Sequence, residues 1–364
     1  MKIKNNFQHL YIHVPFCKKI CDYCDFYKTI DTTKTNPYFL RLEEELIKFQ
    51  SNLQSIKTIF IGGGTPNVFS NADLEKFFSI LEKYLDTKVS EFTTESNPEF
   101  INLDQIKIWK KYHINRISIG IQSTNSNLLA NYNRYQDQEL ENKIMLIKEY
   151  FTNVSFDFIY NFPGQTLEDI KNDLAFIAKH NPDHISWYSL ILKDKTMLKH
   201  KNIKLDEDNE ILFADFIKRE LKKLGYENYE VSNFAKNKKY AWHNLAYWTS
   251  KNWLGVGPSA ATFFYDNEEK CYVEGRNTES IDNWVCEYEN LSSQAAAAQI
   301  IYMNLRLQKG CELTNERIQE SINILWNKIV TLEETKLIEK EGNYMKVTKK
   351  GKNLLNDIFE FMLE

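Results

Sequence analysis

The stretch YIHVPFCKKICDYCDF, residues 11–26, runs from a predicted buried strand into a loop that carries three cysteines. They are Cys17, Cys21 and Cys24. Their CxxxCxxC spacing allows three thiolates to converge on one metal ion or cluster. Three ligands leave one iron of a [4Fe–4S] cluster open, and an open iron can bind a substrate. The alternative is structural zinc with His13 or His9 as the fourth ligand, because zinc sites of three cysteines and one histidine are common.

The sequence shows neither an export signal nor a membrane helix, which indicates a protein in a reducing compartment. The N-terminus lacks the apolar segment of a signal peptide, and no apolar run reaches the roughly 18 residues of a membrane helix. We therefore expect a cytoplasmic protein whose cysteines are reduced, with Cys271, Cys286 and Cys311 as buried thiols. The formal charge of −4 argues against a general nucleic-acid binder.

Strand-like and helix-like patterns alternate through the first two thirds of the chain. Six short apolar segments are predicted strands, and segments with one apolar stripe are predicted helices between them. The six strands are predicted at residues 10–14, 56–61, 89–94, 116–121, 154–159 and 185–192. This alternation predicts a parallel sheet, either open or curled into a partial barrel.

The pattern changes after about residue 205. Residues 240–265 are rich in aromatic side chains and irregular. Residues 313–364 predict two helices, a short β pair around Gly342 and a last helix, an order that resembles a winged helix. Many winged helices serve for packing or protein contact, and DNA binding is the alternative. We predict three units: residues 1–235 as the core barrel, 236–290 as a connecting region and 291–364 as a C-terminal domain.

Polar or glycine-rich motifs follow five consecutive predicted strands. They are the cysteine loop, GGGTP (62–66), TESNPE with Glu95 (94–99), SIGIQS with Gln122 (118–123) and FDFIYNFPGQT with Asp157 (156–166). In parallel β/α barrels the carboxyl ends of the strands form one rim, where functional residues gather. Consecutive glycines allow close approach of the backbone to a ligand, and carboxylates suit amino groups and ribose hydroxyls. Helix capping or ion pairing is the alternative for either carboxylate alone.

Nine motifs together resemble the oxygen-independent coproporphyrinogen oxidase-like proteins of the radical S-adenosylmethionine family. In order they are YIHVPFCKKICDYCDF, FIGGGTP, ESNPE, NRISIGIQS, NRYQD, FIYNFPGQT, YEVSNFA, WHNLAYW and LGVGPSA. Within this family the chain is most similar to the HemW branch, regarded as haem chaperones. Phe26 stands where the oxidase has a fourth cysteine, and only 16 residues precede Cys17 where the oxidase has a long extension. Asn161 replaces the usual glycine and puts the geometry of its loop in doubt.

The resemblance implies a partial (β/α)6 radical-SAM barrel with a smaller, mixed or helical, winged-helix-like C-terminal domain. The three cysteines would hold a [4Fe–4S] cluster whose open iron binds the amino and carboxylate groups of S-adenosylmethionine. Cofactor contacts are implied for Tyr11, Gly63, Gly64, Thr65, Glu95, Gln122, Arg134 and Asp157, with weaker matches at Ser189 and Ala261. Tyr23, just before Cys24, is expected to lie against the adenine.

The segment HNLAYW, residues 243–248, matches an HNxxYW motif that is associated with haem binding in this branch. His243 is the candidate axial ligand, because neutral imidazole is a common haem ligand. Nearby aromatic side chains could wall a flat macrocycle. They are Trp242, Tyr247, Trp248 and Trp253. A hydrogen-bonded surface turn is the alternative for this segment.

The resemblance therefore implies a protein that binds haem and passes it to an acceptor protein, with an electron donor serving the cluster. Peripheral contact with a membrane is compatible with this function, without a transmembrane segment. The enzymatic alternative is anaerobic conversion of coproporphyrinogen to protoporphyrinogen, which Phe26 and the short N-terminus disfavour. A purely structural, metal-bound scaffold is the third alternative.

Overall fold

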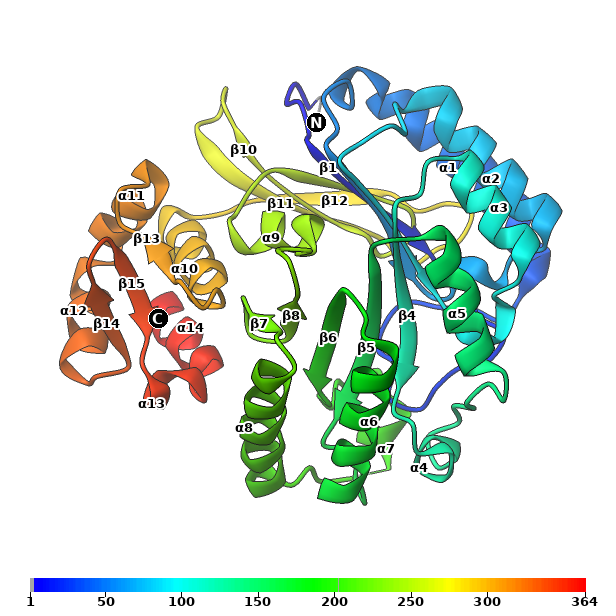
Figure 1. Ribbon diagram of the computed structural model, residues 1–364. Coiled ribbons are helices and arrows are strands. Elements are labelled where there is room, and N and C mark those ends of the chain that lie inside the picture. The colour runs from blue at the N-terminus through cyan, green and yellow to red at the C-terminus, as the bar shows by residue number, and fades with distance from the viewer. Residues whose placement is uncertain (1–2, 202) are drawn as a thin grey trace.

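A twelve-stranded sheet organises the chain, and the computed structural model describes residues 3–201 and 203–364 (Figure 1). Six parallel strands lie side by side in chain order at its centre, which confirms the predicted parallel sheet. They are β1 (His9–Val14), β2 (Thr58–Gly63), β3 (Glu91–Ser96), β4 (Arg116–Gln122), β5 (Val154–Tyr160) and β6 (His184–Ser189). Every observed boundary lies within three residues of its prediction.

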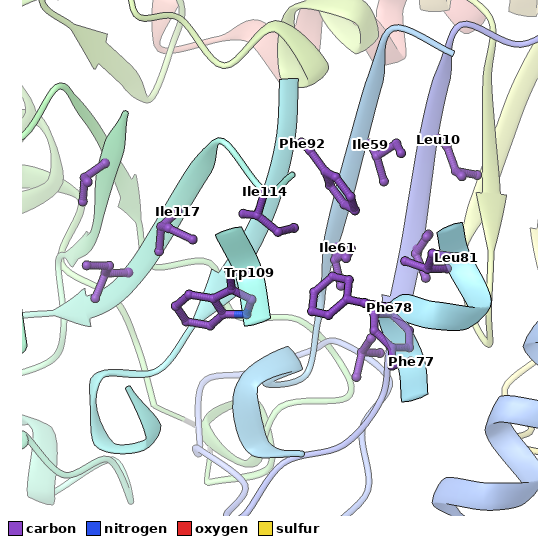
Figure 2. Packing of buried hydrophobic residues seen from close by; sticks show 14 of the residues in the cluster. Leu10, Ile59, Ile61, Phe77, Phe78, Leu81, Phe92, Trp109, Ile114 and Ile117 are labelled. Atoms are coloured by element: carbon purple, nitrogen blue, oxygen red, sulfur yellow. The ribbon is translucent and has the colours of Figure 1, made fainter. Parts of the chain in front are cut away.

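Successive side chains of these strands point to opposite faces, and the two faces differ in polarity. On β2, Ile59 and Ile61 are fully buried beneath the helices, whereas Phe60 lines a cavity on the inner face. Figure 2 shows the outer-face core: Leu10, Ile59, Ile61, Phe92, Ile114 and Ile117 lie beside Phe77, Phe78, Leu81 and Trp109 of the covering helices. Burial of each such side chain contributes roughly 1.5–3 kcal/mol, so this core holds the strands and frees the inner face for polar residues.

Helices connect the strands, and α1, α2, α3, α5 and α6 cover the outer face (Figure 1). The helices of this part are α1 (Thr35–Phe49), α2 (Asn71–Tyr84), α3 (Leu103–Lys111), α4 (Ser126–Ala130), α5 (Leu140–Tyr150), α6 (Leu167–His180), α7 (Met197–His200) and α8 (Glu207–Lys223). Side-chain caps fix several starts: Ser70 Oγ accepts the Asp73 amide at α2, and Thr166 and Asp169 form a capping box at α6. Among the described residues, no helix is long and apolar enough to cross a membrane.

Further strands extend the sheet at both edges. Next to β1 lies β9 (Trp253–Val256), which is parallel to it, followed by β10 (Ala261–Asp266), β11 (Cys271–Asn277) and β12 (Cys286–Asn290). Beyond β6 lie β8 (Asn233–Ala235) and β7 (Glu227–Asn228), and α9 (Trp242–Trp248) lies on the concave side of the sheet (Figure 1). Leu254, Phe264 and Trp284 belong to the same hydrophobic cluster as the central strands. The boundaries at 235 and 290 stay predictions.

The C-terminal part has its own hydrophobic cluster and lies beside the main sheet (Figure 1). Its elements are α10 (Ser293–Leu305), β13 (Cys311–Glu312), α11 (Glu316–Ile324), α12 (Trp326–Glu334), β14 (Ile338–Glu341), β15 (Tyr344–Val347), α13 (Lys349–Lys352) and α14 (Leu355–Leu363). The predicted helix pair and β pair are present, with Gly342 at a left-handed φ of 57° in the turn. A strand that the sequence did not predict, β13, joins β15 and completes a three-stranded antiparallel sheet.

Candidate functional site

Backbone hydrogen bonds fix the two ends of the cysteine loop next to the end of β1. The Cys17 amide donates to Thr29 O at 2.9 Å, and the Thr29 amide donates to Pro15 O at 2.7 Å. This pairing closes residues 17–29 into a loop over the carboxyl end of the strand. Cys17 is buried, and Cys21 and Cys24 are partly exposed. All three thiols line one cavity of about 440 Å³, as the sequence predicted for a shared site.

The donor set fits a cluster better than zinc with a histidine ligand. Nε2 of His13 lies 2.8 Å from the carbonyl oxygen of Tyr27, which can only accept, so Nε2 carries the proton. Nδ1 of His13 then accepts from the Tyr11 hydroxyl at 3.0 Å, which leaves no lone pair for a metal. His9 lies at the start of β1, away from the cysteine loop, and its Nδ1 is hydrogen-bonded to the Thr58 hydroxyl. Among the described residues, no three His, Cys, Asp or Glu side chains are close enough to hold a single metal ion.

Burial shapes the chemistry of the thiols. It raises the pKa of Cys17 to about 11, opposed by the Thr65 hydroxyl 3.6 Å from its sulfur, and it also raises the pKa of Cys24. Such thiols are protonated at neutral pH unless a positive centre binds them, and iron supplies that charge. The cysteines are therefore suited to a metal cluster and poorly suited to free nucleophilic chemistry. Their role as cluster ligands stays a prediction.

The glycine run after β2 allows three close approaches within the protein. A Cβ on Gly62 would lie 2.8 Å from a carboxylate oxygen of Glu95, and one on Gly64 would lie 2.6 Å from Phe16 O. At Gly63 a Cβ would collide with the His13 ring, and its φ of 110° favours glycine in any case. The Gly64 amide donates to Val14 O at 2.7 Å. These close approaches hold the cysteine loop next to the cavity, which Gly63 and Gly64 also line.

Glu95, near the end of β3, is one of the carboxyl groups that line the cavity. The Gly63 amide donates to its Oε2 at 3.1 Å. Burial and the nearby Asp157 raise the pKa of Glu95 to about 8, against the opposing effects of that amide and of Arg116. The carboxyl group is therefore largely protonated at neutral pH, and a cation entering the cavity would favour its ionised form. A perturbed acid in a cavity is typical of a binding site.

Arg134 is held at the cavity by two acceptors. Its Nη2 donates to Gly120 O at 2.6 Å and to Asn97 Oδ1 at 3.0 Å. A β-bulge between Gly120 and Gln122 gives Gln122 a left-handed φ of 69°, a strained conformation for a residue with a side chain. The amide group of Asn97 also donates to Thr65 Oγ1 at 3.2 Å, which joins three rim motifs. The remaining guanidinium N–H groups suit a carboxylate.

Asp157 lies beside Glu95 and is tied to the neighbouring strands. The Ser118 hydroxyl lies 2.9 and 2.8 Å from its two oxygens, and the Ser155 hydroxyl lies 3.2 Å from one of them. Burial raises the pKa of Asp157, while Ser118 and Arg116 oppose the rise. Two carboxyl groups in one cavity repel each other when both are ionised, so the cavity favours a cationic ligand.

Most residues predicted for the site line this one cavity. They are Cys17, Cys21, Tyr23, Cys24, Gly63, Gly64, Thr65, Glu95, Gln122, Arg134, Asp157 and Ser189. Ser189 Oγ is buried with no hydrogen-bond partner among the described residues, which leaves it available to a ligand. Tyr11 lies beside the cavity, bonded to His13, whereas Ala261 and His243 do not line it. Ala261 is an exposed residue of β10, and its cofactor contact stays a prediction.

Sequence reasoning missed Arg116, Ser118 and Tyr188, which also line the cavity. Arg116 is 2% exposed, and its charge acts on both Glu95 and Asp157. The two-residue repeat of side chains along a strand was an available signal, because Arg116, Ser118 and Gly120 lie on the inner face of β4 and alternate with buried isoleucines.

Tyr23 was predicted, and its ring packs edge-to-face on Phe162, with centroids 5.4 Å apart.

His243 lies at the other end of the barrel, where the strands begin. It is fully buried: Nδ1 is 2.7 Å from Thr58 Oγ1, and Nε2 is 2.7 Å from the Tyr247 hydroxyl. Glu91, at the start of β3, accepts the amides of Trp242 and His243 at 2.8 and 2.9 Å. The segment is thus a short helix whose His243 and Ala246 are buried, and not a surface turn. Both ring nitrogens of His243 are engaged, and its role as a haem ligand stays a prediction.

The departure at Asn161 has a direct backbone explanation. Asn161 has a φ of 66°, in the left-handed region that glycine adopts without strain and asparagine tolerates better than most residues. Its side chain is 3% exposed, and its Nδ2 has no hydrogen-bond partner among the described residues. The loop therefore keeps the glycine-like conformation, with a buried amide as the cost of the substitution.

Comparison with known proteins gives one consistent family. A family model described as the radical SAM superfamily matches residues 11–177. A relative from Lactococcus lactis named heme chaperone HemW is 33% identical over 97% of this chain and 97% of its own length. One of the same name from Bacillus subtilis is 30% identical over 96% and 97%. The solved structure of coproporphyrinogen III oxidase from Escherichia coli matches 99% of this chain and 91% of that chain, with a TM-score of 0.82 at 20% identity, and shows the fold alone.

Proposed function

The chain belongs to the radical SAM superfamily and, within it, to the family of relatives named heme chaperone HemW, and we propose from this premise that it is a haem chaperone. In this proposal it binds a [4Fe–4S] cluster, S-adenosylmethionine and haem, and it passes haem to an acceptor protein. The acceptor and an electron donor for the cluster are its proposed partners, and the cytoplasm is its proposed location.

The observation that carries the proposal is the convergence of three thiols and a polar set on one cavity. The guanidinium of Arg134 suits the cofactor's carboxylate, and the carboxyl groups of Glu95 and Asp157 suit its ribose hydroxyls and its positive charge. When bound and reduced, the cluster supplies an electron to the cofactor. The cavity volume of about 440 Å³ is in the range of small-molecule sites, about 300–1,000 Å³.

The oxidase alternative has weaker support. Phe26 occupies the position of the fourth cysteine, and its side chain is 55% exposed at the cavity. The likeness to the solved oxidase is at 20% identity and concerns the fold. The structural-scaffold alternative does not explain why Arg134, Glu95 and a strained Gln122 converge beside the thiols.

We expect the purified protein to bind ferric haem with a defined Soret band and to transfer it to an apo-haem protein on mixing. The titration is run with and without the anaerobically reconstituted cluster, and transfer is followed by the acceptor's own absorption spectrum. Protein heated above its unfolding transition is the control for nonspecific binding. Turnover of coproporphyrinogen without haem transfer would instead favour the oxidase, and absence of both activities with retained metal would favour the scaffold.

The axial-ligand prediction for His243 is tested by replacement with alanine. The change breaks two buried hydrogen bonds and leaves the Thr58 and Tyr247 hydroxyls without this partner, which is expected to lower the free energy of unfolding by about 2–4 kcal/mol. We expect the folded variant to keep the parent's Soret band, because both imidazole nitrogens serve the fold. A shifted or lost band in folded protein would instead identify His243 as the ligand. His200→Ala, at an exposed site, is the matched control.

A further inference from the structure

The mouth of the cavity carries two large apolar side chains that are more than half exposed. Phe26, on the cysteine loop, is 55% exposed, and Ile191, on the loop after β6, is 61% exposed. Both residues line the cavity that holds the three thiols. Exposed apolar residues are ordinary when scattered, but two that line the same cavity offer a surface suited to a flat apolar ligand.

Three lysines line the same mouth. They are Lys19, Lys28 and Lys193. Lys19 and Lys193 are exposed, and the ammonium of Lys19 lies 4.0 Å from the centroid of the exposed Tyr135 ring. Lys28 donates to Cys24 O and Phe26 O and so braces the loop. The acidic residues that line the cavity are Asp25, on the cysteine loop, and Glu95 and Asp157, on β3 and β5. The rim is therefore positive although the whole chain carries a formal charge of −4.

We propose that this mouth is the haem-binding site. The macrocycle would pack against Phe26 and Ile191, and the two propionates would pair with Lys19 and Lys193. The inference rests on the proposed function and names where its cargo binds. Haem combines a flat apolar ring with two carboxylates on one edge, which complements an apolar surface with cationic neighbours. The cavity beneath has room for one small molecule beside the cluster, so the macrocycle lies above it and not within it.

The position at the open end of the barrel agrees with transfer of haem to another protein. His243 is fully buried at the base, whereas Phe26 and Ile191 are reachable by an acceptor without a change of fold. A haem-binding site built from apolar and charged side chains makes no bond to the iron, so haem can leave it without breaking a coordination bond. It also places haem next to the cavity that would hold the cofactor.

The test is a haem titration of full-length parent protein and two rim variants, Ile191→Asp and Lys193→Glu, followed by the Soret absorbance. We expect each variant to bind ferric haem at least about tenfold more weakly, a loss of about 1.4 kcal/mol. The matched controls are Ile47→Asp, on the outer surface of α1 where the residue is 53% exposed, and the exposed Lys309→Glu. The controls are expected to bind haem like the parent.

A second ligand separates the charge contacts from the apolar ones. Haem dimethyl ester has no propionate charges, so Lys193→Glu is expected to leave its affinity within about twofold of the parent, while Ile191→Asp still weakens it. Unchanged haem affinity in both rim variants, with haem binding by the parent, overturns this inference and leaves the proposed function standing. Absence of haem binding by the parent overturns both.

Discussion

Replacement of any one of Cys17, Cys21 and Cys24 by alanine is expected to abolish the iron–sulfur cluster while the chain keeps its fold. Anaerobically reconstituted parent protein should contain about four irons per chain and absorb broadly through thiolate-to-iron charge transfer, and each variant should contain fewer than about one. Loss of one thiolate leaves two ligands for a cluster that the loop can hold with three. Iron and sulfide analysis together with the absorption spectrum measures the effect.

The control for this result is Cys271→Ala, on β11, far in the chain from the cysteine loop and outside the cavity. It should retain the full iron content. The fold of the three variants is checked by their thermal unfolding, because the loop's backbone hydrogen bonds at Thr29 and Pro15 do not depend on the thiols. Zinc in place of iron in the parent, or a cysteine variant with undiminished iron, would contradict the assignment of the cluster.

The central sheet and the rim of the site could be predicted from sequence because their signals are local. Each strand is a short apolar run, and parallel strands joined by helices must bring their carboxyl ends to one side. Glu95, Gln122 and Asp157 were therefore expected at one site from their places in the chain. The alternation along β4 would have added Arg116 and Ser118, because polar residues that alternate with buried isoleucines lie on the opposite face of the strand.

The base of the barrel was less predictable because its contacts are remote in sequence. Glu91 accepts the amides of Trp242 and His243, and Thr58 is bonded to the His243 ring across 185 positions. From sequence alone, His243 could be a haem ligand or part of a hydrogen-bonded surface turn. Which of these holds depends on how far the residue is buried, and strands distant in the chain determine that burial. A carboxylate within a predicted strand, at Glu91, was the available signal that something polar is held there.

The protonation of Glu95 gives the cavity a pH dependence with a definite sign. Burial and Asp157 raise its pKa from 4.5 in the unfolded chain to about 8 in the fold. The titratable and charged groups that interact with it are Asp157 on β5, Arg116 on β4, Tyr11 on β1, Tyr188 on β6 and Tyr247 on α9. Because the folded pKa is the higher one, its contribution to stability is full below about pH 4.5 and is lost as the pH rises through about 8. A ligand with a permanent positive charge reverses this balance by favouring the carboxylate.

The affinity for S-adenosylmethionine is therefore expected to rise up to about tenfold per pH unit between pH 6 and 8 and then to level off, as binding releases a proton from Glu95. Calorimetric titration of the anaerobically reconstituted protein in two buffers of different ionisation enthalpy measures both affinity and proton release. Glu95→Gln should bind more weakly at pH 8 and lose this release. S-adenosylhomocysteine, which lacks the sulfonium charge, should show a shallower profile. Equal slopes for parent and Glu95→Gln would assign the proton to another group, and a flat parent profile would mean that the carboxyl group does not meet the cofactor's charge.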